Sequence, residues 1–187
     1  VPILVGACVW HANRPIRHGP GEVAPLAPVQ TPVGDCASFT HRDCAVKPLA
    51  SFHVKARVLS KKNYRLGREA KLSPVDLALG WGPMSDERTL NRVSTSQFDR
   101  YYTWSVKEFF IPRAEIERNS ANMHMIPASP DVERALKTLR KGSLVEFEGY
   151  LVEITAPDGW RWKSSLSRSD TGGGACEVVW VEELNVL

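Results

Sequence analysis

The chain has 187 residues, of which 43% are hydrophobic and 24% are charged. This length is enough for one globular domain with a tail, and this composition is ordinary for such a domain. The formal net charge of +3 is too small to indicate a polyanionic partner from composition alone.

The first 47 residues differ from the rest in composition and in hydrophobic pattern. Residues 1–10 (VPILVGACVW) are apolar, but a membrane-crossing helix needs about 20 such residues. We interpret them as the end of an export signal or membrane anchor, with a short apolar strand as the alternative. Residues 11–47 are rich in proline and keep no helical or strand period, which predicts a linker. We therefore expect one globular domain over residues 48–187.

Two cysteines lie close together in the predicted linker. Cys36 and Cys44 enclose ASFTHRD, a spacing that can close a small disulfide loop in an oxidising compartment. Zinc binding with His41 is the competing interpretation, but a second ligand pair at finger-like spacing is missing. We predict a disulfide, with two separate thiols as the alternative, and we expect no metal and no cofactor.

Beyond residue 48 the pattern is mixed. FHVKARVL (52–59) alternates apolar and polar side chains, which predicts a half-buried strand. SPVDLALG (73–80) has the proline, acidic residue and closing glycine of a short helix. QFDRYYTWSV (97–106) is rich in aromatic residues that favour a strand, and IPRAEIERN (111–119) predicts a short helix. SPDVERALKTLRKG (129–142) combines an N-cap, one apolar stripe and a closing glycine, so it predicts the clearest helix.

The C-terminal third has strand patterns throughout. SLVEFEGYLVEI (143–154) changes its apolar parity near Gly149, which predicts a bulge or a sharp bend there. A PDG turn and a return strand follow, and CEVVWVEEL (176–184) is the run typical of a strand buried on both faces. We therefore predict an α+β fold: a small, mostly antiparallel β-barrel, oligonucleotide/oligosaccharide-binding-like or similar, with a few short helices.

The segment SSLSRSDTGGGACE (164–177) has the most unusual composition. An aspartic-protease D-T-G at Asp170 would need a second copy, and the glycines lack the lysine and the helix that follow a phosphate loop. Cys176 or Ser165 can act as a nucleophile if His124 and Asp170 lie beside it. The interpretation that we favour is an ordinary turn followed by a buried cysteine.

A basic stretch lies over residues 55–71, with seven basic residues against the single acid Glu69. It can bind single-stranded nucleic acid or anionic lipid, whereas a solvated strand edge protected by lysines is the interpretation that we favour. We therefore do not expect a nucleic-acid partner. The basic residues are Lys55, Arg57, Lys61, Lys62, Arg65, Arg68 and Lys71.

Three longer motifs carry a resemblance. PLASFHVKARVLSKKNYRLGREAKLSPVDLALGWGPMSD, SANMHMIPAS and WRWKSSLSRSDTGGGACEVVWVEEL together resemble bacterial exported or inner-membrane-anchored proteins of unknown function. The resemblance covers residues 48–187. It implies a periplasmic domain tethered to the inner membrane by its N-terminal segment, and it implies no activity, ligand or catalytic residue.

The expected function is that of a non-enzymatic periplasmic binding domain for an envelope protein or glycan. One alternative is a hydrolase or transferase that uses His124 with Cys176, Ser165 or Asp170. Another is nucleic-acid binding through residues 55–71. The residues expected to form the binding surface are Trp81, His124, Arg168, Asp170 and Thr171.

Overall fold

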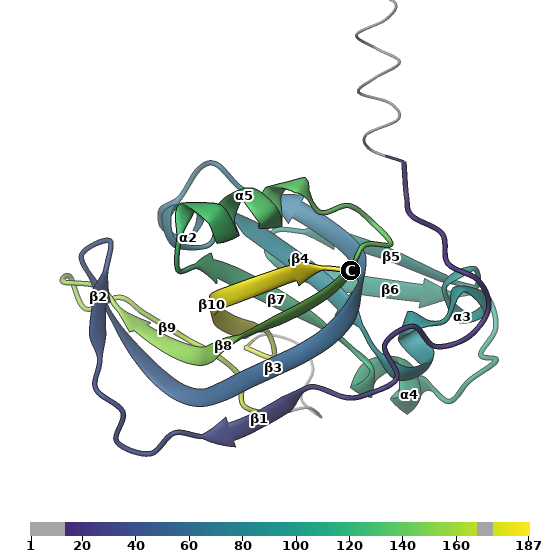
Figure 1. Cartoon of the computed structure of the whole chain (residues 1–187), viewed down its shortest axis with the longest axis horizontal. Coiled ribbons are helices and arrows are strands. Elements are labelled where there is room, and N and C mark those ends of the chain that lie inside the picture. The colour runs from purple at the N-terminus through teal and green to yellow at the C-terminus, as the bar shows by residue number, and fades with distance from the viewer. Residues whose placement is uncertain (1–13, 168–173) are drawn as a thin grey trace, which may run out of the picture.

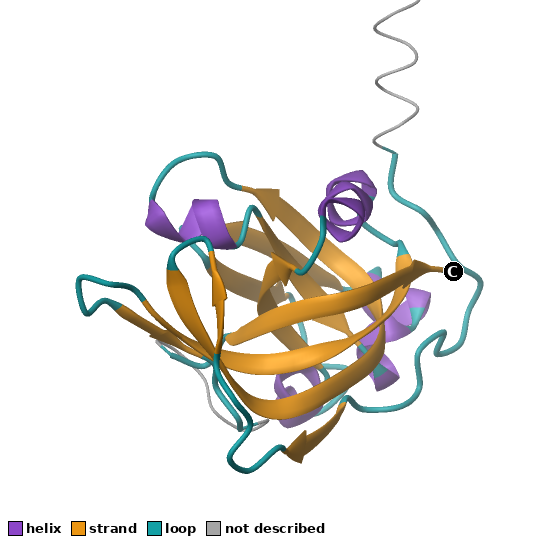
Figure 2. Ribbon diagram, turned by 60° about the vertical axis from the view of Figure 1, so that its left-hand side comes forward, coloured by secondary structure: helices purple, strands orange, loops and turns teal. Residues whose placement is uncertain are grey.

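The computed structural model describes residues 14–167 and 174–187. It is a mixed α+β protein dominated by one eight-stranded sheet, beside which β5 and β6 form a separate two-stranded sheet (Figures 1 and 2). The elements, in chain order, are β1 (Val29–Pro32), β2 (Phe39–His41), β3 (Cys44–Asn63), α2 (Arg68–Leu72), β4 (Val75–Gly80), the 3-10 turn η1 (Gly82–Ser85), α3 (Glu87–Leu90), β5 (Val93–Phe98), β6 (Tyr101–Val106), α4 (Arg113–Arg118), β7 (Ser120–Pro127), α5 (Pro130–Thr138), β8 (Leu144–Thr155), β9 (Arg161–Lys163) and β10 (Glu177–Val186).

Five strands of the large sheet form a closed ring in the order β3-β4-β7-β10-β8, because β8 pairs with both β10 and β3. Only the β7–β10 pair within this ring is parallel. The ring is uneven, since β3 has 20 residues and β4 has six. The short strands β1, β2 and β9 extend the sheet outside the ring. The predicted α+β class is confirmed.

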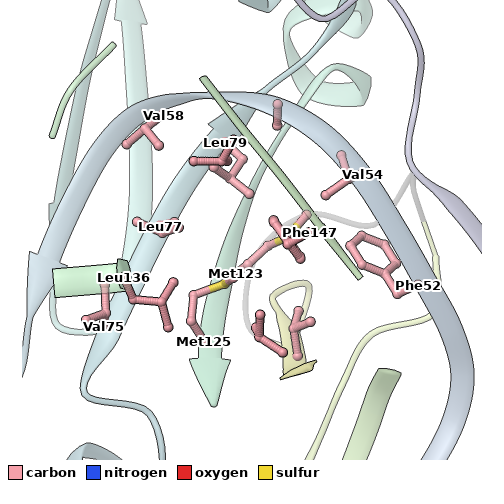
Figure 3. Close-up of a cluster of buried hydrophobic side chains, with 14 of the residues drawn as sticks. Phe52, Val54, Val58, Val75, Leu77, Leu79, Met123, Met125, Leu136 and Phe147 are labelled. Carbon is pink, nitrogen blue, oxygen red and sulfur yellow. The ribbon is translucent and has the colours of Figure 1, made fainter. Parts of the chain in front are cut away.

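The main hydrophobic core fills the inside of the ring. Strand side chains alternate between the two faces of a sheet, so every second residue of each strand points inward. Helix α5 covers one mouth of the ring and adds Leu136, which is fully buried (Figure 1). Each large apolar side chain removed from water in this way contributes about 1.5–3 kcal/mol. Figure 3 shows the inward side chains Phe52, Val54, Val58, Val75, Leu77, Leu79, Met123, Met125, Leu136 and Phe147.

Several predicted elements are confirmed. Helix α5 begins after Ser129, whose Oγ accepts a hydrogen bond from the Val132 amide at 3.3 Å. Helix α4 and the strands over 52–59 and 143–154 are also present. The bulge expected near Gly149 is present as well, but the extra residue lies in the partner strand β10, between Val181 and Glu183.

Two predictions about local structure are wrong. Residues 75–80 form the strand β4 instead of a helix, because all six are buried and the alternation that marks a strand disappears when both faces are covered. Residues 97–106 form a hairpin instead of one strand. Its turn residues Asp99 and Arg100 have φ angles of 46° and 66°, as a two-residue type I′ turn requires.

The described part of the predicted linker packs against the domain. Ala24 is fully buried, and its carbonyl accepts a hydrogen bond from the Gly82 amide at 2.7 Å. The Ile16 amide donates to the Lys141 carbonyl at 2.9 Å. Where the sequence predicts a spacer, the structure therefore has a segment packed on the domain, the short strands β1 and β2, and the start of β3. Within residues 14–167 and 174–187, no helix has the length and apolar character needed to cross a membrane.

Candidate functional site

The outer face of β4 and β7 carries polar side chains that are nevertheless buried. Asp76 lies opposite His124, and Ala78 lies opposite Asn122, in the antiparallel pairing of the two strands. Their sequence neighbours fill the core of the ring, so these four side chains point away from it. Asp76 is fully buried and His124 is 4% exposed, which means that other segments of the chain cover this face.

Asp76 is the centre of a buried ionic group, which we call the Asp76 network (Asp76, Arg100, His124). Arg100 reaches in from the turn of the β5–β6 hairpin, and its Nη1 donates to Asp76 Oδ1 at 2.6 Å. His124 Nδ1 lies 3.0 Å from Asp76 Oδ2, although the angle is not that of a hydrogen bond. The buried Asp76 carboxylate needs a cation such as Arg100, because burial of an unpaired charge costs several kcal/mol.

Aromatic rings from two other segments close over the Asp76 network. The Arg100 guanidinium lies 3.8 Å from the ring centre of Tyr64 and 5.8 Å from that of Trp162. The Tyr64 hydroxyl accepts a hydrogen bond from the Arg100 amide at 2.9 Å, and the His124 and Trp162 ring centres are 4.8 Å apart. The hairpin turn, the β3–β4 connection and β9 are therefore held together at one place on the ring.

A cavity of about 540 Å³ opens next to this network, and we call it the β6 cavity. Its walls are strand β6, helix α4, the start of β7 and the segment before β10. The aromatic part of the wall is ordered by mutual contacts, since the Trp104 and Phe109 ring centres are 6.2 Å apart and the Arg113 guanidinium lies 5.7 Å from the Trp104 ring. The lining residues used below are Trp81, Tyr102, Trp104, Arg118, Asn122 and Cys176.

Asn122 connects the β6 cavity to the Asp76 network. Its Nδ2 donates to the Arg100 carbonyl at 3.0 Å and lies 3.6 Å from Cys176 Sγ, and its Oδ1 accepts from Gln97 at 2.7 Å. Beside it, burial raises the pKa of Tyr102 to about 12. The wall thus combines aromatic surface with a few fixed polar groups, the pattern of many ligand sites.

The structure brings some of the sequence-predicted residues to this region. Trp81 and Cys176 line the β6 cavity, and His124 belongs to the Asp76 network. Ser165 donates its amide proton to the Cys176 carbonyl at 3.1 Å. The contacts seen for His124 are with Asp76 and Trp162, so its use as a catalytic base stays a prediction. The remaining candidates, Arg168, Asp170 and Thr171, lie outside the described residues.

The basic residues of the stretch over 55–71 do not share one surface. Arg57 is 4% exposed and forms an ion pair with Glu87. Arg68 pairs with Asp158 at 2.5 Å, and Lys61 Nζ donates to the Lys137 carbonyl at 2.6 Å. Only Arg57 is therefore removed from solvent. The other six basic residues are exposed or half-buried, so nucleic-acid binding by this stretch stays a prediction.

Cys36 and Cys44 are both free thiols in the structure, the first exposed and the second buried at the start of β3. The disulfide predicted for them is not formed here, and the oxidation state in cells remains a prediction. Among the described residues, no cluster of three or more His, Cys, Asp or Glu side chains is placed to hold a metal ion.

Sequence reasoning missed Asp76, Arg100 and Asn122. The sequence contains one signal, the acidic residue inside the apolar run VDLALG, but Ser73 and Pro74 before it give this segment the pattern of a helix cap. No protein-family model matches this chain, and no significant match was found among curated proteins or solved structures. The site is therefore argued from its geometry alone.

Proposed function

We propose that this chain is a non-enzymatic binding domain whose ligand site is the β6 cavity. The observation that carries the proposal is the position of this cavity, on the outer face of β7 and beside the loops that cover β4 and β7. We further propose that the ring is an oligonucleotide/oligosaccharide-binding-like barrel. In such barrels the second and third strands, with the loops after the first and fourth strands, form the ligand face.

The order of the elements supports this comparison. If β3 is the first strand of the ring, β4 and β7 are the second and third, and β8 and β10 are the fourth and fifth. The connections at 64–74 and 156–167, the second of which contains β9, then flank the face that holds the Asp76 network. Tyr64 comes from the first loop and Trp162 from the second, so both loops reach the same face.

The size and chemistry of the cavity support binding. Its volume of about 540 Å³ lies within the range of small-ligand sites, roughly 300–1,000 Å³. The candidate base His124 is 4% exposed and lies between a buried carboxylate and an indole ring, which leaves a substrate little access to it. We therefore propose a supporting role for His124. The resemblance of residues 48–187 implies a periplasmic domain, and we therefore propose an envelope protein or glycan as the partner.

A thermal-shift screen of the full chain tests the proposal. The panel consists of short randomised peptides, oligothymidylates, N-acetylglucosamine oligomers and divalent metals. A ligand at 100 times its dissociation constant stabilises a domain by about 2.7 kcal/mol, which appears as several degrees in the midpoint. Trp104→Ala, within the cavity, should abolish the shift, and Trp160→Ala, in the β8–β9 turn, should preserve it.

Two results would contradict the proposal. A ligand whose shift survives Trp104→Ala but disappears in Trp160→Ala would place the site elsewhere. Chemical turnover of a panel compound, lost in Cys176→Ala, would favour the hydrolase or transferase alternative.

A further inference from the structure

The unpaired edge of β6 faces the β6 cavity. β5 and β6 form a sheet of only two strands, so one long edge of β6 has no neighbouring strand. Every residue of β6, from Tyr101 to Val106, lines the cavity. Side chains alternate between the two faces of a strand, so a cavity that all six residues line lies along the edge of β6.

The hairpin turn determines which backbone groups point into the cavity. In a two-residue hairpin the residues that flank the turn exchange both hydrogen bonds, here Phe98 and Tyr101. The N–H and C=O groups of alternate residues therefore point toward β5 or away from it. Those of Tyr102, Trp104 and Val106 point away, and within the described residues no hydrogen bond is formed by them. They repeat at every second residue along an edge about 20 Å long.

We infer that the occupant of the β6 cavity is an extended peptide segment of another protein, which adds to β6 as a third strand. This inference rests on the proposed function and names its partner. An alternating row of amide donors and carbonyl acceptors is matched by the same row in a second peptide backbone, and added strands obtain affinity from these bonds. The aromatic surface of Trp104 and Phe109 offers a place for an apolar side chain of the peptide.

The charges around the cavity favour a peptide that carries a carboxylate. Arg113 and Glu117 also line the cavity, but Arg113 Nε donates to Glu117 Oε1 at 2.8 Å, so these charges compensate each other. Arg118 is exposed and makes no ion pair within residues 14–167 and 174–187. A carboxylate beside Arg118 would form a charge-assisted hydrogen bond, which is stronger than a neutral one. Glu177, also on the wall, is 2% exposed and offers little surface to a ligand.

The decisive experiment uses backbone methylation. Short randomised peptides displayed on phage are selected on the immobilised full chain, and the tightest peptide is synthesised with an N-methyl group at each position in turn. Strand addition predicts an alternating pattern. Methylation of amides that face β6 should weaken binding about tenfold or more, and methylation of the amides between them should have little effect.

Two variants test the same geometry from the side of the protein. Val106→Pro removes an outward N–H group without removing a hydrogen bond to β5. It should therefore weaken peptide binding clearly more than Val106→Ala does. Arg118→Glu should lower the affinity for a selected acidic peptide about tenfold, and Arg134→Glu on α5 should leave this affinity unchanged. If Val106→Pro fails to fold, amide exchange of the wild type replaces it. The peptide should then slow exchange at Tyr102, Trp104 and Val106 and leave Thr103 unchanged.

The possible failures are distinguishable. One failure is a peptide whose binding is abolished by Trp104→Ala but whose affinity does not depend on the position of the N-methyl group. This result overturns strand addition and leaves the cavity as a binding site. Binding of a glycan or an oligonucleotide there, without any peptide, does the same. Self-association of the chain in sedimentation, abolished by Trp104→Ala, would make a second copy the occupant and also overturns the inference. A panel with no ligand sensitive to Trp104→Ala overturns both proposals.

Discussion

Asp76 and His124 face each other across β4 and β7, with Asp76 Oδ2 and His124 Nδ1 3.0 Å apart and almost no solvent around them. The other carboxylate oxygen binds Arg100, so one acidic side chain ties the hairpin of the small sheet to the ring. The wall of the β6 cavity is built from that hairpin. The ion pair between Arg100 and Asp76 thus holds in place the strand edge that we propose as the binding surface.

Asp76→Asn should therefore destabilise the fold strongly. The substitution leaves the Arg100 guanidinium, whose side chain is 18% exposed, without its carboxylate. Removal of one partner of a buried ion pair costs about 3–5 kcal/mol, measurable as a lower midpoint of urea unfolding. Asp158→Asn is the control, because Asp158 forms its ion pair with Arg68 at an exposed position and should change the midpoint little. Equal effects of the two substitutions would contradict a central role for Asp76.

Asp86 should make stability depend on pH in the acid range. Hydrogen bonds from the Arg88 side chain, assisted by the amides of Arg88 and Gly21, lower the pKa of Asp86 from 3.8 to about 2. Because the folded pKa lies below the unfolded one, this stability is present above about pH 4 and is lost as the pH falls toward 2. Urea unfolding of Asp86→Asn across this window should show a flatter dependence than the wild type. An equally steep dependence in Asp86→Asn would contradict this role of Asp86.

Tyr102 should ionise only at strongly alkaline pH in the folded chain. Burial raises its pKa to about 12, although an interaction with the Ser120 hydroxyl opposes the shift. A raised pKa means that the stability is present below about pH 10 and is lost as the pH rises toward 12. Tyrosinate absorbance after rapid alkaline mixing should show a phenol that ionises well above pH 10 and that is absent from Tyr102→Phe. Ionisation of every phenol near pH 10 before unfolding would contradict the burial of Tyr102.

Gly149→Ala should weaken the pairing of β8 with β10. A Cβ atom at this position would collide with the Trp180 carbonyl oxygen, which belongs to the backbone and cannot move aside alone. Overpacking of this kind costs about 1–3 kcal/mol or more, again measurable by urea unfolding. Gly19→Ala is the matched control, because a Cβ atom there has no neighbour within 4 Å among the described residues. An unchanged midpoint for Gly149→Ala would show that the two strands are farther apart than described.

The three cysteines within the described residues should react with maleimide in the order of their exposure. Cys36 is exposed, Cys176 is half-buried on the cavity wall and Cys44 is buried, so we expect fast, slow and unfolding-dependent labelling respectively. Mass spectrometry of alkylated peptides, without reductant, measures the three rates. Failure of both Cys36 and Cys44 to react until reductant is added would reveal the disulfide that the sequence predicts.

Secondary structure could be predicted from the sequence where the local signals agree. Helix α5 has its cap, its apolar stripe and its acidic first turn in one segment, and the strand over 52–59 alternates clearly. Strand β4 was missed because its outer face is covered by the hairpin and the loops. Full burial removes the alternation, and Ser73, Pro74 and Asp76 then imitate the start of a helix.

The candidate site could be predicted only in part, for a related reason. His124 and Cys176 are chemically conspicuous, and both lie at the site. Asp76, Arg100 and Asn122 come from β4, a hairpin turn and β7, and only the pairing of distant strands brings them together. The unpaired edge of β6 is a property of the backbone, which leaves no trace in residue types.

The closure of the ring by β3 and β8 has a consequence for folding. Residues 45–57 pair with residues 144–155, so this seam joins segments separated by about half of the chain. Such distant contacts lose chain entropy before they gain energy, which slows folding. During synthesis, β3 emerges before β8, and the apolar side chains of β3 on this side stay exposed until β8 is made. We therefore expect slow refolding with a collapsed species that exposes β3, and a chaperone that binds extended apolar strands should delay its aggregation.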